Sequence, residues 1–472
     1  MKPKDGELWN LVLPAAKDAL RKIKETRDSE RKVESYPSFP KLKDVDAREF
    51  IQLEVDYRVI DFKKVFSNDA KWRSTPHSYS DIAGYAELLD YVLTKPDYMA
   101  FHGWGGDPDD KFGPGMVEFG AADIVIEIAA RHASVLGFEW DESFALARYV
   151  ELEAWWQGGT LPVRLYIPIL NTSFEQDDIP LSPSVSIRRI SPERHVERLF
   201  DLRQFERDEW KYRACTHALI VEGLASVEWP RSFGLPQWRD FPYDVIDRAV
   251  QAISVESLEP TGYHQVCYEP IGWASGYRGS LGQVAHSFIV NRHSTKLSST
   301  ENSPTVILNA EEAARVASNF SGLAAANAQV GLAAKRFQLA TLRGDELDEI
   351  VDLCVGIEAL LGGTQPGETT YKLAVRGAAV LARSREQFDA ALTAQLIKKV
   401  YSYRSQVVHG QVKYDKKRKI RLGDDEFLAT DVAHFLLQRL LAVMIGEPAL
   451  IDKIDNDAVL YEIIDEWSKL EE

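Results

Sequence analysis

A chain of 472 residues, 45% hydrophobic and 27% charged, is long enough to fold into two or three globular domains. Its formal net charge of −16 argues against a protein that coats nucleic acid with a uniformly basic surface, so any contact with RNA must be local. Three scattered cysteines indicate neither a disulfide framework nor a zinc site, and no apolar leader or membrane-spanning run is evident. We therefore expect a soluble, cytoplasmic protein without a metal or cofactor.

Residues 1–44 open the chain with apolar side chains at helical spacing between Leu8 and Ile23. The segment then becomes charged and reaches Pro37 and Pro40, which disfavour a continuing helix. We interpret it as an N-terminal helix followed by a linker.

Residues 45–300 combine helical and strand-like patterns, which indicate a mixed α/β region, and we expect this region to have a sensing or regulatory role. The Gly-, Asp- and Pro-rich segment 103–115 predicts a loop. Helical periodicity predicts helices over 79–93, 121–133 and 144–156. Strand patterns cover 51–62, 163–169, 185–190 and 218–222.

Residues 305–472 are rich in Ala, Leu, Glu and Arg at helical spacing, with glycines where helices would end. Short loops between long amphipathic helices predict an all-α up-and-down bundle, and the whole chain an α+β protein. The expected helices cover 310–342, 345–361, 369–382, 385–408, 424–445 and 459–470.

The segment from Tyr403 to Gly410 places Arg404 five residues before His409, near the end of a predicted helix. A guanidinium can hold a phosphate through paired hydrogen bonds, and an imidazole can move protons near neutral pH, so the pair suits phosphodiester chemistry without metal. The spacing alone carries little weight, since it would arise by chance in about every second sequence of this composition. A surface Arg beside a His that caps the helix is the alternative.

A regular helix turns about 140° over five residues, so Arg404 and His409 could not share one face. A left-handed cap at Gly410 could release His409 from that register, or a partner subunit could complete the groove.

A basic run follows this segment. A phosphate-steering patch and a solvated basic turn or hairpin are both compatible with it. Its members are Lys413, Lys416, Lys417 and Arg418, with Lys419 and Arg421.

Three segments, 350–361, 371–378 and 401–410, resemble in this order the HEPN superfamily, most closely its Apea-like domains, and the likeness covers about residues 305–446. In that family a long helix ends with an Arg, four to six residues and a His, as in 401–410 here. Segment 350–361, with Glu358, resembles the family's helix with an internal Glu, and 371–378, with Arg376, resembles the next helix.

The resemblance implies a metal-independent endoribonuclease. His409 would take the proton of a ribose 2′-hydroxyl or protonate the leaving oxygen, while Arg404 would hold the phosphate. Ser405, where the family often has Asn, His or Asp, is the third expected site residue, with Tyr403 in support. Glu358 and Arg376 would form a buried pair that orients the motif helix, or are ordinary surface residues.

RNA and a second copy of the chain are the implied partners, because many family members form homodimers. The implied setting is defence against phage, with a phage-derived trigger, or a toxin system. A non-catalytic dimerisation module that binds a protein or small ligand is the alternative function. A nuclease silenced by its own N-terminal region is a third.

Two further patterns in the sequence resemble functional sites. Arg189 and His195 repeat the motif spacing loosely, but Pro192 and the strand-like flank argue against a helical site there. Asp107, Asp109, Asp110 and Glu118 suggest a calcium loop, but Phe112 replaces the glycine that its turn needs, which favours a solvated acidic loop.

Overall fold

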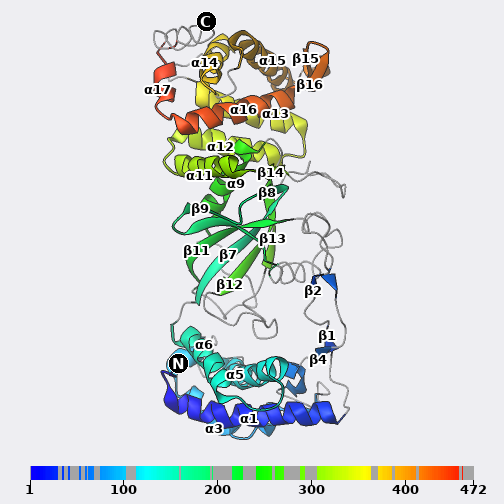
Figure 1. Ribbon diagram of the computed structural model, residues 1–472, viewed down its shortest axis with the longest axis vertical. Coiled ribbons are helices and arrows are strands. Elements are labelled where there is room, and N and C mark those ends of the chain that lie inside the picture. Colours follow the sequence, from blue (N-terminus) through cyan, green and yellow to red (C-terminus); the bar gives the residue numbers. More distant parts are fainter. Residues whose placement is uncertain are drawn as a thin grey trace.

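Three units follow one another along the longest axis of the computed structural model: a helical unit with the N-terminus, a sheet, and a helical bundle with the C-terminus (Figure 1). This order confirms the α+β class. The structure describes residues 2–29, 35–36, 41–42, 53–54, 59–60, 62–67, 75–101, 113–158, 161–191, 194, 215–226, 241–257, 261–270, 287–292, 306–362, 370–384, 388–410, 414–456 and 460.

The N-terminal unit packs α1 against α3 and α5, and α5 against α6. The buried carboxylate of Glu153 on α6 accepts the backbone N–H groups of Lys4 and Asp5, each at 2.7 Å, while Asp5 caps Leu8. Because the first N–H groups of a helix lack internal partners, Glu153 fixes α6 to the start of α1. The helices are α1 (Gly6–Asp28), α3 (Tyr85–Leu93), α4 (Pro96–Phe101), α5 (Gly113–Val135) and α6 (Glu142–Gly158).

Short elements accompany these helices: β1 (Ser35–Tyr36), β2 (Lys41–Leu42), β3 (Leu53–Glu54), β4 (Val59–Ile60), η1 (Phe62–Val65), β5 (Phe66–Ser67), β6 (His77–Ser78) and η2 (Tyr79–Asp81). The predicted N-terminal helix is confirmed. The predicted strand over 51–62 is seen as β3 and β4, with residues outside the description between them. Of the predicted loop, residues 103–112 lie outside the described residues, and 113–115 are wrong because they begin α5.

The central sheet has the order β13-β12-β7-β11-β10-β9, with antiparallel neighbours throughout. The alternate residues Leu165, Ile167 and Ile169 of β7 enter one core, as expected for a strand with one face on helices. Three predicted strands are confirmed as β7, β10 and β11. The strands are β7 (Leu161–Leu170), β9 (Asp178–Ser182), β10 (Val185–Arg189), β11 (His217–Ser226), β12 (Gly262–Pro270) and β13 (Ser287–Arg292).

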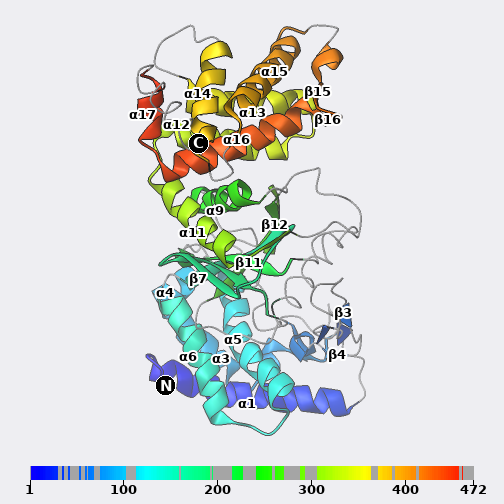
Figure 2. The ribbon, with the colours of Figure 1, turned by 45° about the horizontal axis from the view of Figure 1, so that its top comes forward.

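Helices α9 (Tyr243–Glu256) and α11 (Ala310–Ala324) lie between the sheet and the bundle (Figure 2). Strand β14 (Val306–Leu308) pairs in parallel with β8 (Thr172–Phe174), and α11 adds Ala313, Val316 and Phe320 to the sheet's core. The first elements after residue 305 therefore pack on the sheet, although the domain boundary itself stays a prediction.

The prediction of a single helix over 310–342 is wrong, because the helix is interrupted between α11 and α12 (Ala328–Leu342). The Asn327 side chain accepts the N–H of Val330 at 2.9 Å and so starts a new helix. The side chain of Asn can bond to the backbone in place of the helical hydrogen bonds, so Asn327 favours a new helix start at this position. The apolar periodicity does not reveal this start, because apolar residues continue on both sides of it.

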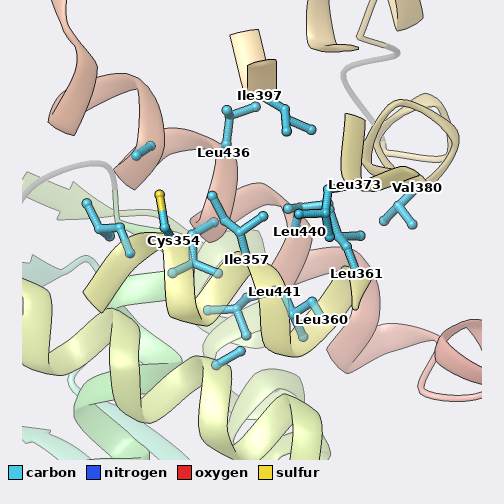
Figure 3. Packing of buried hydrophobic residues seen from close by; sticks show 14 of the residues in the cluster. Cys354, Ile357, Leu360, Leu361, Leu373, Val380, Ile397, Leu436, Leu440 and Leu441 are labelled. Atoms are coloured by element: carbon cyan, nitrogen blue, oxygen red, sulfur yellow. The ribbon is translucent and has the colours of Figure 1, made fainter. Parts of the chain in front are cut away.

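The bundle packs α12 to α16 around one core. Its helices are α13 (Glu346–Leu361), α14 (Thr370–Ala382), α15 (Ala390–Val408), α16 (Ala429–Gly446) and the short α17 (Leu450–Ile454). A Cβ on Gly356 of α13 would lie 2.6 Å from Leu437 Cδ2 on α16, so the glycine permits their close approach. Figure 3 shows this core, which includes Cys354, Ile357, Leu360, Leu361, Leu373, Val380, Ile397, Leu436, Leu440 and Leu441.

Two predicted helix starts in the bundle differ from the structure. Helix α15 begins at Ala390, because Asp389 accepts the N–H of Leu392 and caps it. The segment before α16 is not helical but a hairpin of β15 (Lys419–Leu422) and β16 (Asp425–Leu428) that turns at Gly423, whose φ is 62°. The last predicted helix lies outside the described residues except for residue 460.

Helix α9 joins the sheet to the bundle. Gln438 on α16 donates through Nε2 to the carbonyls of Ser254, at 2.8 Å, and Ser257. Gln338 on α12 accepts from Gln251 at 2.7 Å. These bonds satisfy buried polar groups and tie the bundle to the end of α9.

Among the described residues, α16 is long and apolar enough to cross a membrane, but 67% of that stretch is buried inside the bundle, as in a core helix of a soluble protein. Cys215, Cys267 and Cys354 all lie within the described residues, and no disulfide joins them.

His217 on β11 generates a prediction about stability and pH. Its ring is fully buried: Nε2 lies 2.9 Å from the Gln176 carbonyl and Nδ1 2.8 Å from the Thr216 hydroxyl. Burial lowers the pKa of His217 to about 4. An unfolded His binds its proton near pH 6.5, so this contribution to stability is present above pH 6.5 and is lost as pH falls toward 4.

We expect the wild-type protein to lose roughly 1–2 kcal/mol of unfolding free energy between pH 7.5 and 5 relative to His217→Gln. Urea unfolding of both proteins at each pH measures this difference. The comparison with the variant is needed because burial raises the pKa of Glu127 to about 7. This raised pKa increases the unfolding free energy as pH falls, and it does so equally in both proteins. Equal pH slopes would contradict the prediction.

Candidate functional site

Arg404 lies on the core-facing side of α15. At 100° per residue, it shares a face with Ile397 and Val400, both buried. Its Nη2 lies 3.8 Å from Glu358 Oε1 on α13, and its side chain is 29% exposed. Its Nε is buried and has no hydrogen-bond partner among the described residues. The guanidinium thus lies at the edge of the core and is held by one long ion pair.

His409 ends the same helix with its side chain exposed. Its backbone φ is −87° and its N–H donates to the Ser405 carbonyl at 3.1 Å, so the helical path continues to His409. The left-handed cap is present at Gly410, with φ 60°, but follows His409 and leaves its register unchanged. The side chains of Arg404 and His409 therefore leave the helix about 140° apart in one chain.

Ser405 is exposed, whereas Tyr403 is fully buried. The Tyr403 hydroxyl donates to Glu346 Oε1 at 3.2 Å, and Arg418 donates to both carboxylate oxygens of Glu346 at 2.6–3.1 Å. Tyr403 thus anchors the helix to α13 and does not face solvent.

The basic run is divided among different environments. Lys413 lies outside the described residues. Lys417 of η4 (Tyr414–Lys417) donates to the Ser402 hydroxyl on α15, and Arg418 is engaged by Glu346, while Lys416 is exposed. The run forms the expected turn and hairpin, as η4 and the β15–β16 pair, while its role in steering phosphate stays a prediction.

The expected pairing of Glu358 with Arg376 is wrong. Arg376 is buried and donates to the Leu361 carbonyl at 2.8 Å and to Asp455 at 2.9 Å. It therefore joins α14 to the end of α13 and to the segment after α17, whereas Glu358 contacts Arg404. Helical periodicity could not reveal this exchange, because both arginines lie on core-facing sides.

The thiol of Cys354 and the hydroxyl of Tyr401 are buried near Arg404 and are uncharged. Burial raises the pKa of the Cys354 thiol, and it raises that of the Tyr401 hydroxyl, which donates to the Cys354 carbonyl at 3.1 Å. Neither group ionises near neutral pH, so the charges at this position are those of Arg404 and Glu358.

The second Arg/His pair and the acidic loop give no site in the described part of the chain. Arg189 lies on strand β10, pairs with Asp177 and donates to the Phe174 carbonyl at 3.3 Å. His195 and residues 107–110 lie outside the description, and Glu118 belongs to α5. No group of three or more His, Cys, Asp or Glu within the described ranges is arranged to hold a metal.

Sequence reasoning did not single out Tyr371 of α14 or Lys398 of α15. Tyr371 is 63% exposed, and the Lys398 ammonium lies 5.3 Å from its ring centroid. The signal that could have revealed this surface is the absence of Asp and Glu from both helices.

Comparisons of the chain with known protein families, with curated proteins and with solved structures found no match. The HEPN resemblance therefore rests on the motif residues described above.

The two arginine contacts predict different stability effects. Arg376→Leu should lower the unfolding free energy by about 2–4 kcal/mol, because it leaves the Leu361 carbonyl without its buried donor and breaks the pair with Asp455. Glu358→Gln should cost less than about 1 kcal/mol, since its ion pair is partly exposed and long. Chemical denaturation measures both, and comparable losses would contradict this division.

Proposed function

We propose that this protein is a metal-independent endoribonuclease of the HEPN type that cuts RNA in the cytoplasm. The observation that carries the proposal is that α15 ends with an exposed imidazole, His409, about 1.4 turns after the guanidinium of Arg404, whose ion-pair partner among the described residues is Glu358 at 3.8 Å. Such a cation can exchange its carboxylate partner for a phosphate, and a surface His can transfer protons.

In the proposed reaction, His409 accepts the proton of a ribose 2′-hydroxyl, and the 2′-oxygen attacks the neighbouring phosphorus. The bond from phosphorus to the 5′-oxygen breaks, and that oxygen takes its proton from a water molecule, while His409 releases its proton to solvent. The products are a 2′,3′-cyclic phosphate and a free 5′-hydroxyl. Arg404 stabilises the charge that grows on the phosphoryl oxygens. Ser405, exposed one residue after Arg404, is the polar neighbour.

The 140° between the two side chains supports a site shared by two chains. In a homodimer related by a two-fold axis near the end of α15, Arg404 of one chain could meet His409 of the other. Val408, an apolar residue 51% exposed beside His409, fits such a covered end.

A non-catalytic dimerisation and binding module is the second candidate. It is favoured by the internal engagement of three cations at this end of the bundle: Arg404 with Glu358, Arg418 with Glu346, and Lys417 with Ser402. In that function the bundle would dimerise, and the N-terminal region would bind a protein or small ligand.

For the nuclease, the resemblance suggests phage defence or a toxin system. The N-terminal helical unit and the sheet would then sense a phage-derived trigger or restrain the bundle.

The test is cleavage of labelled RNA in EDTA by the wild-type protein, Arg404→Ala and His409→Ala. We expect each substitution to lower the rate at least about 100-fold, since proton transfer and charge stabilisation are each worth that much. An equimolar mixture of the two inactive variants should regain about a quarter of the wild-type rate, because half of the dimers would contain one intact shared site.

Equal cleavage by all three proteins would remove the nuclease assignment. Loss of activity in the variants without recovery on mixing would restrict the reaction to one chain and contradict the shared site. Expression in a host adds a second readout: toxicity of the wild-type chain that His409→Ala abolishes would reject the non-catalytic module.

A further inference from the structure

Helices α14 and α15 lack carboxylates in a strongly acidic chain. Together they contain 32 residues, in which about five Asp or Glu would be expected at the chain's overall frequency, and neither contains one. They carry instead five cations: Lys372, Arg376, Lys398, Lys399 and Arg404. Positive charge is thus concentrated on this helix pair, against the net charge of the whole protein.

One stripe of α15 faces solvent: Lys398, Ser405 and His409 are exposed and Ser402 is half-buried. Lys398, Ser402, Ser405 and His409 follow at steps of four, three and four residues, so they fall within an arc of about 60° and extend over about 16 Å. The stripe lies opposite the core-facing side, and its last residue is the proposed catalytic imidazole.

Helix α14 forms one wall of this stripe. Its first turn carries Tyr371 and Lys372, both exposed, and the Tyr371 ring lies 5.3 Å from the Lys398 ammonium. A phenol ring 63% open to solvent and beside a cation is unusual for a core aromatic but suits a platform for a flat ligand.

The turn η4 forms the other wall. Lys417 reaches across to the Ser402 hydroxyl, and Lys416 next to it is exposed. The open stripe is therefore bordered by lysines on both sides, with an aromatic ring at the end remote from His409.

We propose that this stripe binds single-stranded RNA, with a base stacked on Tyr371 and phosphates held by Lys372, Lys398 and Lys416 on the way to His409. The inference rests on the proposed nuclease function and assigns its substrate class. Exposed aromatic rings interleaved with cations recognise single strands, whose bases are free to stack. An acidic peptide would use the lysines but gain little from the ring, and a duplex would offer no unstacked base.

The test measures binding, separately from cleavage. The full-length protein is titrated by fluorescence anisotropy against a labelled single-stranded oligonucleotide with 2′-O-methyl groups, which has no attacking hydroxyl. Tyr371→Ala should weaken binding about 5- to 100-fold, and Tyr371→Phe should remain within about twofold of wild type, because stacking needs the ring and not the hydroxyl. Lys398→Glu should also weaken binding and lower the salt dependence by about one phosphate contact.

Matched controls come from surfaces elsewhere in the bundle. Phe427→Ala removes an exposed aromatic ring from strand β16, and Lys453→Glu reverses an exposed lysine on α17; both should bind as wild type does. Thermal unfolding of every variant separates a lost contact from a lost fold.

Wild-type affinity in Tyr371→Ala, or no binding by the wild-type protein, would overturn the inference. Tighter binding of an RNA duplex or a polyglutamate peptide than of the single strand would overturn it too. His409→Ala separates the two proposals. If the binding differences hold while His409→Ala still cleaves natural RNA as wild type does, the catalytic assignment fails and the strand-binding surface stands.

Discussion

The regular path of α15 through Val408 is the constraint on which the site depends. Tyr401 and Tyr403 hold this helix to α13 through the Cys354 carbonyl and the Glu346 carboxylate. With the helix fixed in rotation, Arg404 must lie toward the core and His409 away from it. A relaxed helix end could bring the two side chains onto one face of a single chain, but the structure keeps the helical register as far as His409.

Helix α13 distributes charge across the bundle. Glu346 engages Arg418, Asp352 holds Arg336 and Arg343 at 2.7 Å each, and Glu358 contacts Arg404. These pairs differ in strength because Asp352 is buried whereas Glu358 is 39% exposed and more distant from its partner. Of the four arginines, Arg404 is held least firmly, which is why it is the one that we propose contacts a phosphate.

Much of the fold could be predicted from apolar periodicity. The expected helices at 345–361 and 369–382 match α13 and α14 within one residue, and three strands of the sheet are found where alternation placed them. The errors occur where a side chain competes with the helix or a turn interrupts it, as at Asn327 and in the β15–β16 hairpin.

The candidate site was less predictable than the fold. Spacing identified Arg404 and His409 and gave their angular separation, because both follow from one regular helix. Partner choice was not predictable: Arg376 turns to Asp455 and Glu358 to Arg404, since these contacts depend on how helices distant in sequence meet. Tyr371 and Lys398 come from two different helices, and only packing makes them neighbours.

The end of α9 has a consequence for dissecting this protein. Val255 belongs to the hydrophobic core of the bundle, and Gln438 donates hydrogen bonds to the carbonyls of Ser254 and Ser257. A fragment that starts near residue 305 would lack Ser254, Val255 and Ser257, and it would expose apolar surface on α12 and α16. The bundle is thus completed by residues from the preceding region, so its stability depends on the end of α9.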